Sequence, residues 1–236
     1  MPAGPRNHTI DLIRTFAIVL MVVFHFIFDL KYFGYIDWDI PDGNGWYQFR
    51  NVIVGGFMSC VGLSLGMAAR ARNGARDPRL KRRVLKVAAC ALLTTATSLA
   101  LYPEAWIYFG VLHFIALMYV ISQPLLDRPR LAAALGGGMV LLYWLGVPPY
   151  GWPFEYLAEV LPSYTVDFVS PSPWIGVVWL CVALGQSNWL RSDPLGRWKF
   201  AARAGAPGRH SLIIYLIHQP ILFAGFWILG SLLGHA

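Results

Sequence analysis

The chain has 236 residues, of which 57% are apolar and 13% are charged. Soluble domains carry about 25% charged residues, so this composition argues against a soluble fold and indicates a membrane protein. The formal net charge is +7, but the basic residues follow the loops between apolar segments. We attribute this charge to membrane topology and expect a lipid bilayer, and no nucleic acid, as the partner.

Seven apolar segments approach or exceed the length of about 20 residues that a helix needs to cross the hydrocarbon core. Because the first segment contains Arg14 and Asp29 and no small-residue cleavage motif follows it, we expect a retained helix rather than a signal peptide. The sequence predicts an all-α, polytopic membrane helix bundle of about seven transmembrane helices in a single domain, 1–236. The seven segments are 10–32, 51–69, 84–102, 106–125, 131–147, 173–190 and 211–233.

The basic residues predict the orientation, since Lys and Arg concentrate in cytoplasmic loops. With the N-terminus inside, 17 of the 19 Lys and Arg residues fall in cytoplasmic segments. Only Lys31 and Arg50 fall outside. We therefore predict a multi-pass protein of the cell's inner (plasma) membrane, with its N-terminus inside and its C-terminus outside.

The first segment holds the densest set of ionisable residues. Such residues are costly at membrane depth, which makes them functional candidates. His25 and Asp29 are four residues apart and share a helical face, so the carboxylate could accept the imidazole hydrogen and make the other ring nitrogen a better base. The alternative is a polar pair that only joins helices, and the spacing alone does not decide between them.

Arg14 and His25 also share a face of this helix. They are eleven residues apart, a rise of about 16 Å and about half of the hydrocarbon core. A long ligand with an anionic head and a reactive tip could extend between them. Acetyl-coenzyme A has this shape, with its phosphates near Arg14 and its thioester near His25.

Two further histidines lie inside predicted spans. His113 is either a group that hydrogen-bonds a substrate or a satisfied core histidine. His218 precedes Gln219 and Pro220, and the proline disrupts the helical ladder. These residues either line the path of the cofactor or are the local polar partners of a kink.

Three other features of the sequence bear on packing and function. The outer loop 148–172 carries Tyr150, Trp152, Phe154, Tyr156 and Tyr164 and no Lys or Arg, which is typical of an interfacial aromatic belt or of a rim that stacks on a sugar. Gly62 and Gly66 form a small-residue face that packs helices and permits, without requiring, a homodimer. No internal repeat of the transporter kind is evident.

Several segments, in order, resemble the bacterial heparan-α-glucosaminide N-acetyltransferase catalytic-domain family. Arg14, ten further residues and His25 also resemble a pattern of transmembrane acyltransferases. The resemblance runs over nearly the whole chain and implies acetyl transfer from acetyl-coenzyme A to a glycan-type acceptor across the membrane. In eukaryotic lysosomal members the active histidine follows the first span, where this chain has Asp37 and no histidine, so the resemblance assigns that role to His25. The matching segments are 21–30, 107–114, 173–177 with 184–185, and 208–220.

The expected enzyme is therefore a transmembrane acyltransferase that acetylates an amine or hydroxyl, with His25 as the general base and Asp29 orienting it. Arg50, Asn51 and His113 are the candidates for stabilising the oxyanion or binding the acceptor. An acetyl-histidine intermediate is the alternative chemistry. Coenzyme A is expected near the remaining candidates, Arg14, His218 and Gln219.

Two other functions fit the same residues. His25 and His113 on different helices could be the axial ligands of a b-type haem, which would make the chain an electron-transfer protein. A His–Asp pair could instead relay protons in a coupled transporter. Neither of these functions requires acetyl-coenzyme A.

Overall fold

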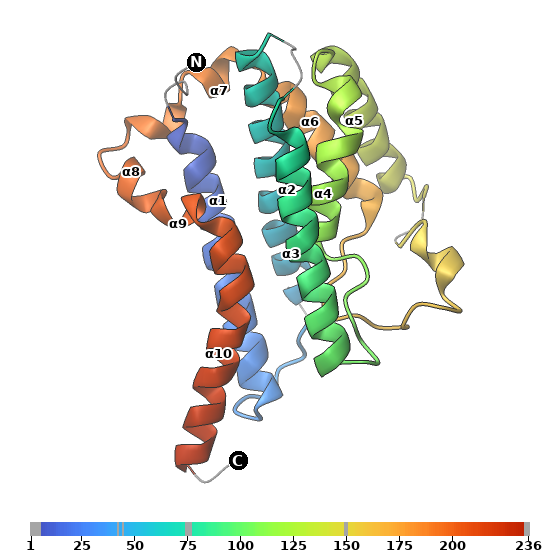
Figure 1. The fold of residues 1–236 in the computed structure, drawn as a ribbon, viewed down its shortest axis with the longest axis vertical. Helices are drawn as coiled ribbons and strands as arrows, with labels where there is room; N and C mark the ends of the chain where they lie inside the picture. The colour runs from blue at the N-terminus through green and yellow to red at the C-terminus, as the bar shows by residue number, and fades with distance from the viewer. Residues whose placement is uncertain (1–5, 42, 44, 74–76, 149–150, 234–236) are drawn as a thin grey trace. The chain divides into compact units, whose positions relative to one another are not determined.

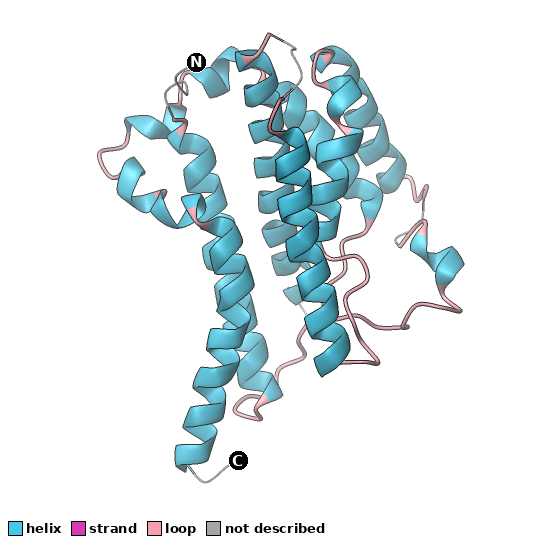
Figure 2. Cartoon of the chain, viewed as in Figure 1, coloured by secondary structure: helices cyan, strands magenta, loops and turns pink. Residues whose placement is uncertain are grey.

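The computed structural model describes residues 6–41, 43, 45–73, 77–148 and 151–233. These residues form helices and loops without any strand, which confirms the predicted all-α class (Figures 1 and 2). The chain divides into two compact units. We call them the terminal unit (7–57 and 195–233) and the central unit (58–194), and the helix α2, Trp46–Ala71, contributes to both.

The terminal unit is built on α1, which packs against α8, α9 and α10. Asn7 caps α1, since its Oδ1 accepts from the backbone N–H of Ile10 at 3.1 Å. The helix ends before Gly34, whose positive φ of 77° suits a residue without Cβ. The bounds are α1 His8–Tyr32, η3 Pro194–Arg197, α8 Ala201–Ala204, α9 Ala206–Arg209 and α10 Ser211–Leu233.

The central unit holds two helix pairs, α3 with α4 and α5 with α6. Gly136 of α5 and Gly176 of α6 allow close approach, because a Cβ on Gly136 would lie 2.7 Å from the Gly176 carbonyl oxygen. The unit's elements beyond α2 are α3 Leu80–Leu101, α4 Val111–Ile121, η1 Gln123–Leu125, α5 Pro129–Trp144, η2 Phe154–Leu157, α6 Pro171–Gly185 and α7 Asn188–Arg191.

The small-residue face predicted in α2 packs within the chain. A Cβ on Gly62 would overlap the carbonyl oxygen of Val178 in α6, and one on Gly66 would overlap that of Val182. The glycines therefore bring the backbones of α2 and α6 together. This face is occupied and is not available as the surface of a homodimer.

Four of the seven predicted spans are helices long and apolar enough to cross a membrane, namely α1, α2, α3 and α10. The other three correspond to α4, α5 and α6, which have 11, 16 and 15 residues. Each is shorter than the roughly 20 residues of a full crossing. The start predicted at residue 106 is wrong for α4, which begins at Val111, where the backbone N–H donates to Asp167 Oδ2 at 3.1 Å.

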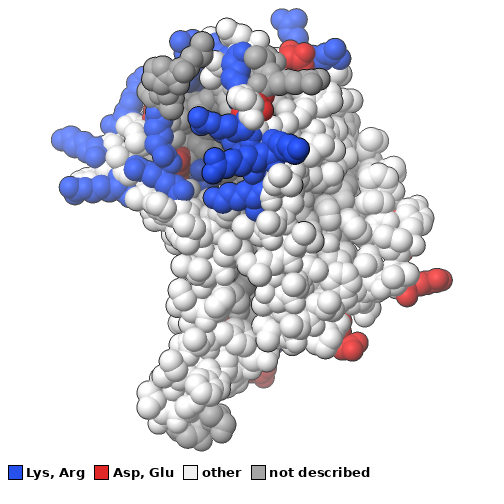
Figure 3. Space-filling model, in the orientation of Figure 1, with Lys and Arg blue, Asp and Glu red and all other residues white. Residues whose placement is uncertain are grey.

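Charge is separated along the central unit. Its Lys and Arg side chains gather at the end where α2 leads into α3 (Figure 3). Asp77 pairs there with Arg72 at 3.6 Å and with Arg83 at 3.0 Å. Glu104 follows the opposite end of α3, and no Lys or Arg occurs in the loop 148–172. The described part of this unit thus has one basic end and one acidic end.

Candidate active site

Two histidines meet where α1 packs against α10 in the terminal unit. The imidazole rings of His25 and His218 are in edge contact, with their centroids 4.7 Å apart and their planes at 79°. His25 lies on α1 and His218 on α10. These two residues are 193 positions apart along the chain.

Each histidine is anchored by its own helix. His25 Nδ1 lies 2.9 Å from the Met21 carbonyl oxygen, and His218 Nδ1 lies 2.8 Å from that of Tyr215. Because a carbonyl oxygen only accepts, each Nδ1 must carry the hydrogen. The Nε2 atom of each neutral ring is therefore the basic nitrogen.

Asp29 of α1 is fully buried, and a residue of α10 forms a hydrogen bond with it. Its Oδ1 accepts from Gln219 Nε2 at 2.8 Å. The hydrogen bond predicted between Asp29 and His25 is not formed among the described residues. The imidazole hydrogen is directed to Met21, one turn back on α1, and the carboxylate turns to α10. The shared helical face brings these residues near each other without making them partners.

We call the group of His25, Asp29, His218 and Gln219 the histidine cluster. This cluster has too few hydrogen-bond donors for its acceptors. Asp29 Oδ2, His218 Nε2 and Gln219 Oε1 are buried without a hydrogen-bond partner in the described residues. All three atoms are acceptors as the side chains are placed. Buried polar groups are normally satisfied, and an exception calls for an explanation. A proton, or a ligand that donates hydrogen bonds, would satisfy this cluster.

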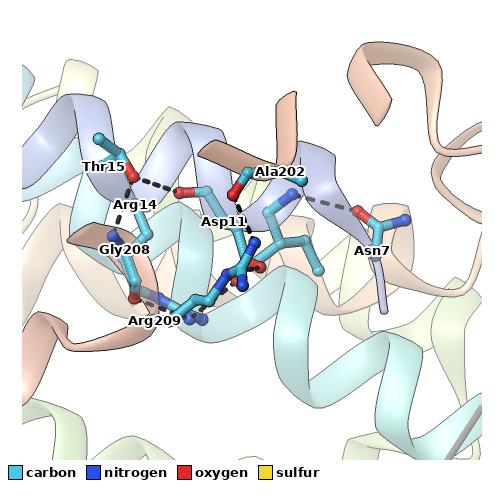
Figure 4. A network of polar contacts seen from close by, with 8 residues as sticks. Asn7, Asp11, Arg14, Thr15, Ala202, Gly208 and Arg209 are labelled. Carbon is cyan, nitrogen blue, oxygen red and sulfur yellow. Dashed lines mark hydrogen bonds and ion pairs between the residues drawn. The ribbon is translucent and has the colours of Figure 1, made fainter. Parts of the chain in front are cut away.

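A second polar network joins the start of α1 to α9 (Figure 4). Asp11 lies 3.8 Å from Arg14 Nη1 and 3.7 Å from Arg209 Nε. Arg14 also approaches the Gly208 carbonyl oxygen at 3.5 Å, and Thr15 Oγ1 accepts from the Gly208 N–H at 2.9 Å. Two guanidinium groups thus meet at one carboxylate.

The side chain of Arg14 remains accessible within this network, since 25% of its surface is exposed. Arg209 is 31% exposed. Arginine forks suit phosphate oxygens. Both residues could thus bind an anionic group while they hold α1 and α9 together.

The third intramembrane histidine, His113, lies in the central unit and is fully engaged. Its Nδ1 accepts from the Gly110 N–H at 3.3 Å, and its Nε2 lies 3.1 Å from Thr95 Oγ1. Since Thr95 Oγ1 donates to the Ile107 carbonyl oxygen at 2.7 Å, it can accept from His113. This arrangement matches the satisfied core histidine of the two alternatives.

Arg50 and Asn51 lie in the part of α2 that belongs to the terminal unit. The Arg50 guanidinium carbon is 5.7 Å from the Tyr47 ring centroid, within cation–π range. Neither residue is joined to the histidine cluster by a hydrogen bond or ion pair described above.

The aromatic residues of the outer loop 148–172 divide by exposure. Phe154 packs against Phe109, with ring centroids 4.6 Å apart, and against Tyr108 at 5.6 Å. Trp152, Tyr156 and Tyr164 are exposed, which fits both the belt and the sugar-stacking interpretations. Tyr150 lies outside the described residues.

Sequence reasoning placed His218 and Gln219 on the cofactor path, whereas the structure joins them to His25 and Asp29. Only one signal in the sequence pointed to this contact. The first helix carries the ionisable residues His25 and Asp29, and the last helix carries the polar pair His218 and Gln219. Because polar groups inside apolar helices need partners, the two pairs were candidates for contact. The pairing itself depends on the packing of α1 against α10.

Four long apolar helices, two of which carry the histidine cluster, define a helical membrane protein with acid–base groups on its apolar helices. Residues 6–220 match the family model described as heparan-alpha-glucosaminide N-acetyltransferase, catalytic. The chain therefore belongs to this family, which confirms the resemblance and implies membrane acetyltransferase activity. Searches of curated proteins and of solved structures found no match.

Proposed function

We propose that the chain transfers an acetyl group from cytoplasmic acetyl-coenzyme A to an amine or hydroxyl of an extracytoplasmic glycan-type acceptor. The histidine cluster is the observation that carries this proposal. It places a basic imidazole nitrogen inside the apolar part of a membrane acetyltransferase. Such a nitrogen is the group that acyl transfer needs to remove the acceptor's proton.

His25 is the proposed general base, acting through Nε2. Met21 fixes the tautomer by accepting from Nδ1, a task that the sequence assigned to Asp29. Asp29 lies one turn away on the same helix, and its negative charge would stabilise the imidazolium through space. Arg50 and Asn51 remain proposed ligands of the acceptor or of the oxyanion.

Coenzyme A is proposed to bind with its phosphates at the partly exposed side chains of Arg14 and Arg209. Both arginines pair with the carboxylate of Asp11, and two guanidinium groups side by side favour a polyanionic head. From there the pantetheine arm would extend along α1, and the rise of about 16 Å from Arg14 to His25 suits an extended linker.

We further propose seven crossings of the inner (plasma) membrane in one catalytic domain, with the N-terminus inside and the C-terminus outside. The basic end of the central unit and the arginines at the start of α1 support this orientation. The short helices α4, α5 and α6 would complete their crossings with adjoining turns such as η1.

The two alternative functions receive less support. A haem ligand needs a free ring nitrogen, and both nitrogens of His113 are hydrogen-bonded to protein groups. The His–Asp bond that suggested a proton relay is replaced by the Asp29–Gln219 bond. Substrate flux without consumption of acetyl-coenzyme A would nevertheless identify a transporter.

The test is acetyl transfer by the purified protein in lipid nanodiscs. With acetyl-coenzyme A and an amino-sugar acceptor, wild type should release free thiol and form acetylated sugar in equal amounts. His25→Ala should lower the rate about 10²–10⁴-fold, the usual contribution of a general base. A well-folded His25→Ala protein with near-wild-type activity would exclude the proposed role.

A further inference from the structure

Acetyl transfer takes one proton from the acceptor and delivers one to the sulfur of coenzyme A, and the proposed function assigns a group to only the first of these two transfers. The acceptor must lose a proton as it attacks the thioester. The departing sulfur of coenzyme A must gain one, unless it leaves as a thiolate. A second acid–base group near the first would complete the reaction without water in the membrane.

His218 has the properties of such a group. Its ring touches that of His25 at 4.7 Å between centroids. Its Nδ1 hydrogen is committed to the Tyr215 carbonyl oxygen, and its Nε2 is buried without a hydrogen-bond partner in the described residues. A proton on Nε2 would therefore be directed at whatever enters this space.

We propose that His218 is the general acid that protonates the leaving thiolate of coenzyme A, while His25 serves as the base. This assignment rests on the proposed acetyl-transfer function. It changes the role of His218 from a lining residue of the cofactor path to a catalytic residue.

The steps balance in atoms and charge. The acceptor heteroatom forms a bond to the acetyl carbon, and its proton passes to His25 Nε2. The carbon–sulfur bond then breaks, and the proton on His218 Nε2 moves to the sulfur, giving free coenzyme A. Transfer of one proton from His25 to His218, across their ring contact, restores the starting state.

The neighbouring side chains are less suited to this role. Gln219 does not titrate, and its Nε2 is engaged with Asp29 Oδ1. Asp29 has its Oδ1 engaged by Gln219 and forms no ring contact with His218 among the described residues. The Tyr215 carbonyl oxygen only accepts, and it already accepts from His218 Nδ1.

The experiment compares two acetyl donors that differ in one atom, acetyl-coenzyme A and its selenoester analogue. Selenols are more acidic than thiols, so the selenolate leaves without help from an acid. The variants are His218→Asn and His25→Asn. In each, the amide nitrogen can replace Nδ1 in its bond to the backbone carbonyl, and Nε2 is lost. Size-exclusion profiles and thermal melting would verify that the variants fold.

His218→Asn should slow transfer from acetyl-coenzyme A about 10²–10⁴-fold. The factor by which it slows transfer from the selenoester should be at least tenfold smaller. His25→Asn should slow both reactions alike. Equal loss with both donors in His218→Asn would overturn the proposal and indicate a positioning role. A donor-dependent loss confined to His25→Asn would reverse the two roles. Failure of wild type to use either donor would instead refute the acetyl-transfer function itself.

Discussion

The two units hold half-buried histidines in opposite states. In the central unit both nitrogens of His113 are satisfied by groups of the surrounding loop and of α3. In the terminal unit His25 and His218 touch each other, and a buried Nε2 has no hydrogen-bond partner in the described residues. Since unsatisfied polar groups cost stability, the three unsatisfied atoms of the histidine cluster, Asp29 Oδ2, His218 Nε2 and Gln219 Oε1, indicate a site that awaits a ligand or a proton.

The largest expected effect is the contrast between these histidines in catalysis. His25→Asn should lower kcat about 10²–10⁴-fold while the melting temperature stays near that of wild type. His113→Asn should leave kcat of the folded protein within about threefold, because its bonds are structural. Steady-state kinetics and thermal melting of both variants would test this contrast, and it fails if His113→Asn loses activity as severely as His25→Asn.

The next effect concerns the recognition of coenzyme A. Arg14→Gln removes a charge that we assign to phosphate binding, so KM for acetyl-coenzyme A should rise about tenfold, the loss expected for one charge-assisted contact of roughly 1.4 kcal/mol. The rate at saturation should change little. Arg83→Gln, in the first turn of α3 at the basic end of the central unit, is the matched control and should leave KM unchanged. Equal effects of the two substitutions would show that only general surface charge matters.

A stability difference between the units follows from His113. His113→Leu leaves the Gly110 N–H without its acceptor and Thr95 Oγ1 without its donor, which should cost about 1–3 kcal/mol. Unfolding in a denaturing detergent, followed by circular dichroism, would measure it. His218→Leu removes an unsatisfied atom and should cost less, or stabilise the protein. The comparison is wrong if His218→Leu is the more destabilising of the two.

The smallest expected effect is on the carboxylate of Asp29. Gln219→Glu would replace the amide donor by a second acidic group, whereas Gln219→Asn keeps the donor on a shorter side chain. We expect Gln219→Glu to lower thermal stability by about 1–2 kcal/mol through loss of the hydrogen bond, and Gln219→Asn to cost less. Thermal melting in lipid nanodiscs would rank the two, and the reverse order would contradict the Asp29–Gln219 pairing.

Apolar periodicity and length predicted the helical class and the positions of the four long apolar helices, because each depends on local composition. The outer end of α4 was misplaced for a physical reason. Residues 106–110 are apolar enough for a span, yet Asp167, distant in sequence, caps the helix at Val111. Such a cap depends on tertiary contact, and no local pattern records it.

Only part of the candidate site was predicted from the sequence, because the rest of it also depends on tertiary contacts. Spacing along one helix singled out His25 and Asp29, but it also implied a bond that the structure replaces with Met21 and Gln219. The contact between His25 and His218 depends on how α1 and α10 rotate against each other. Hydrophobic patterns fix that rotation only to within the width of an apolar face.

The central claim is that the histidine cluster receives the thioester of acetyl-coenzyme A. A structure of the full chain in nanodiscs with a non-transferable acetyl-coenzyme A analogue tests it most directly. The account predicts density with its phosphates at Arg14 and Arg209 and its sulfur within hydrogen-bonding reach of His25 or His218 Nε2. Density that ends away from both histidines, or no binding at millimolar ligand, would contradict the account.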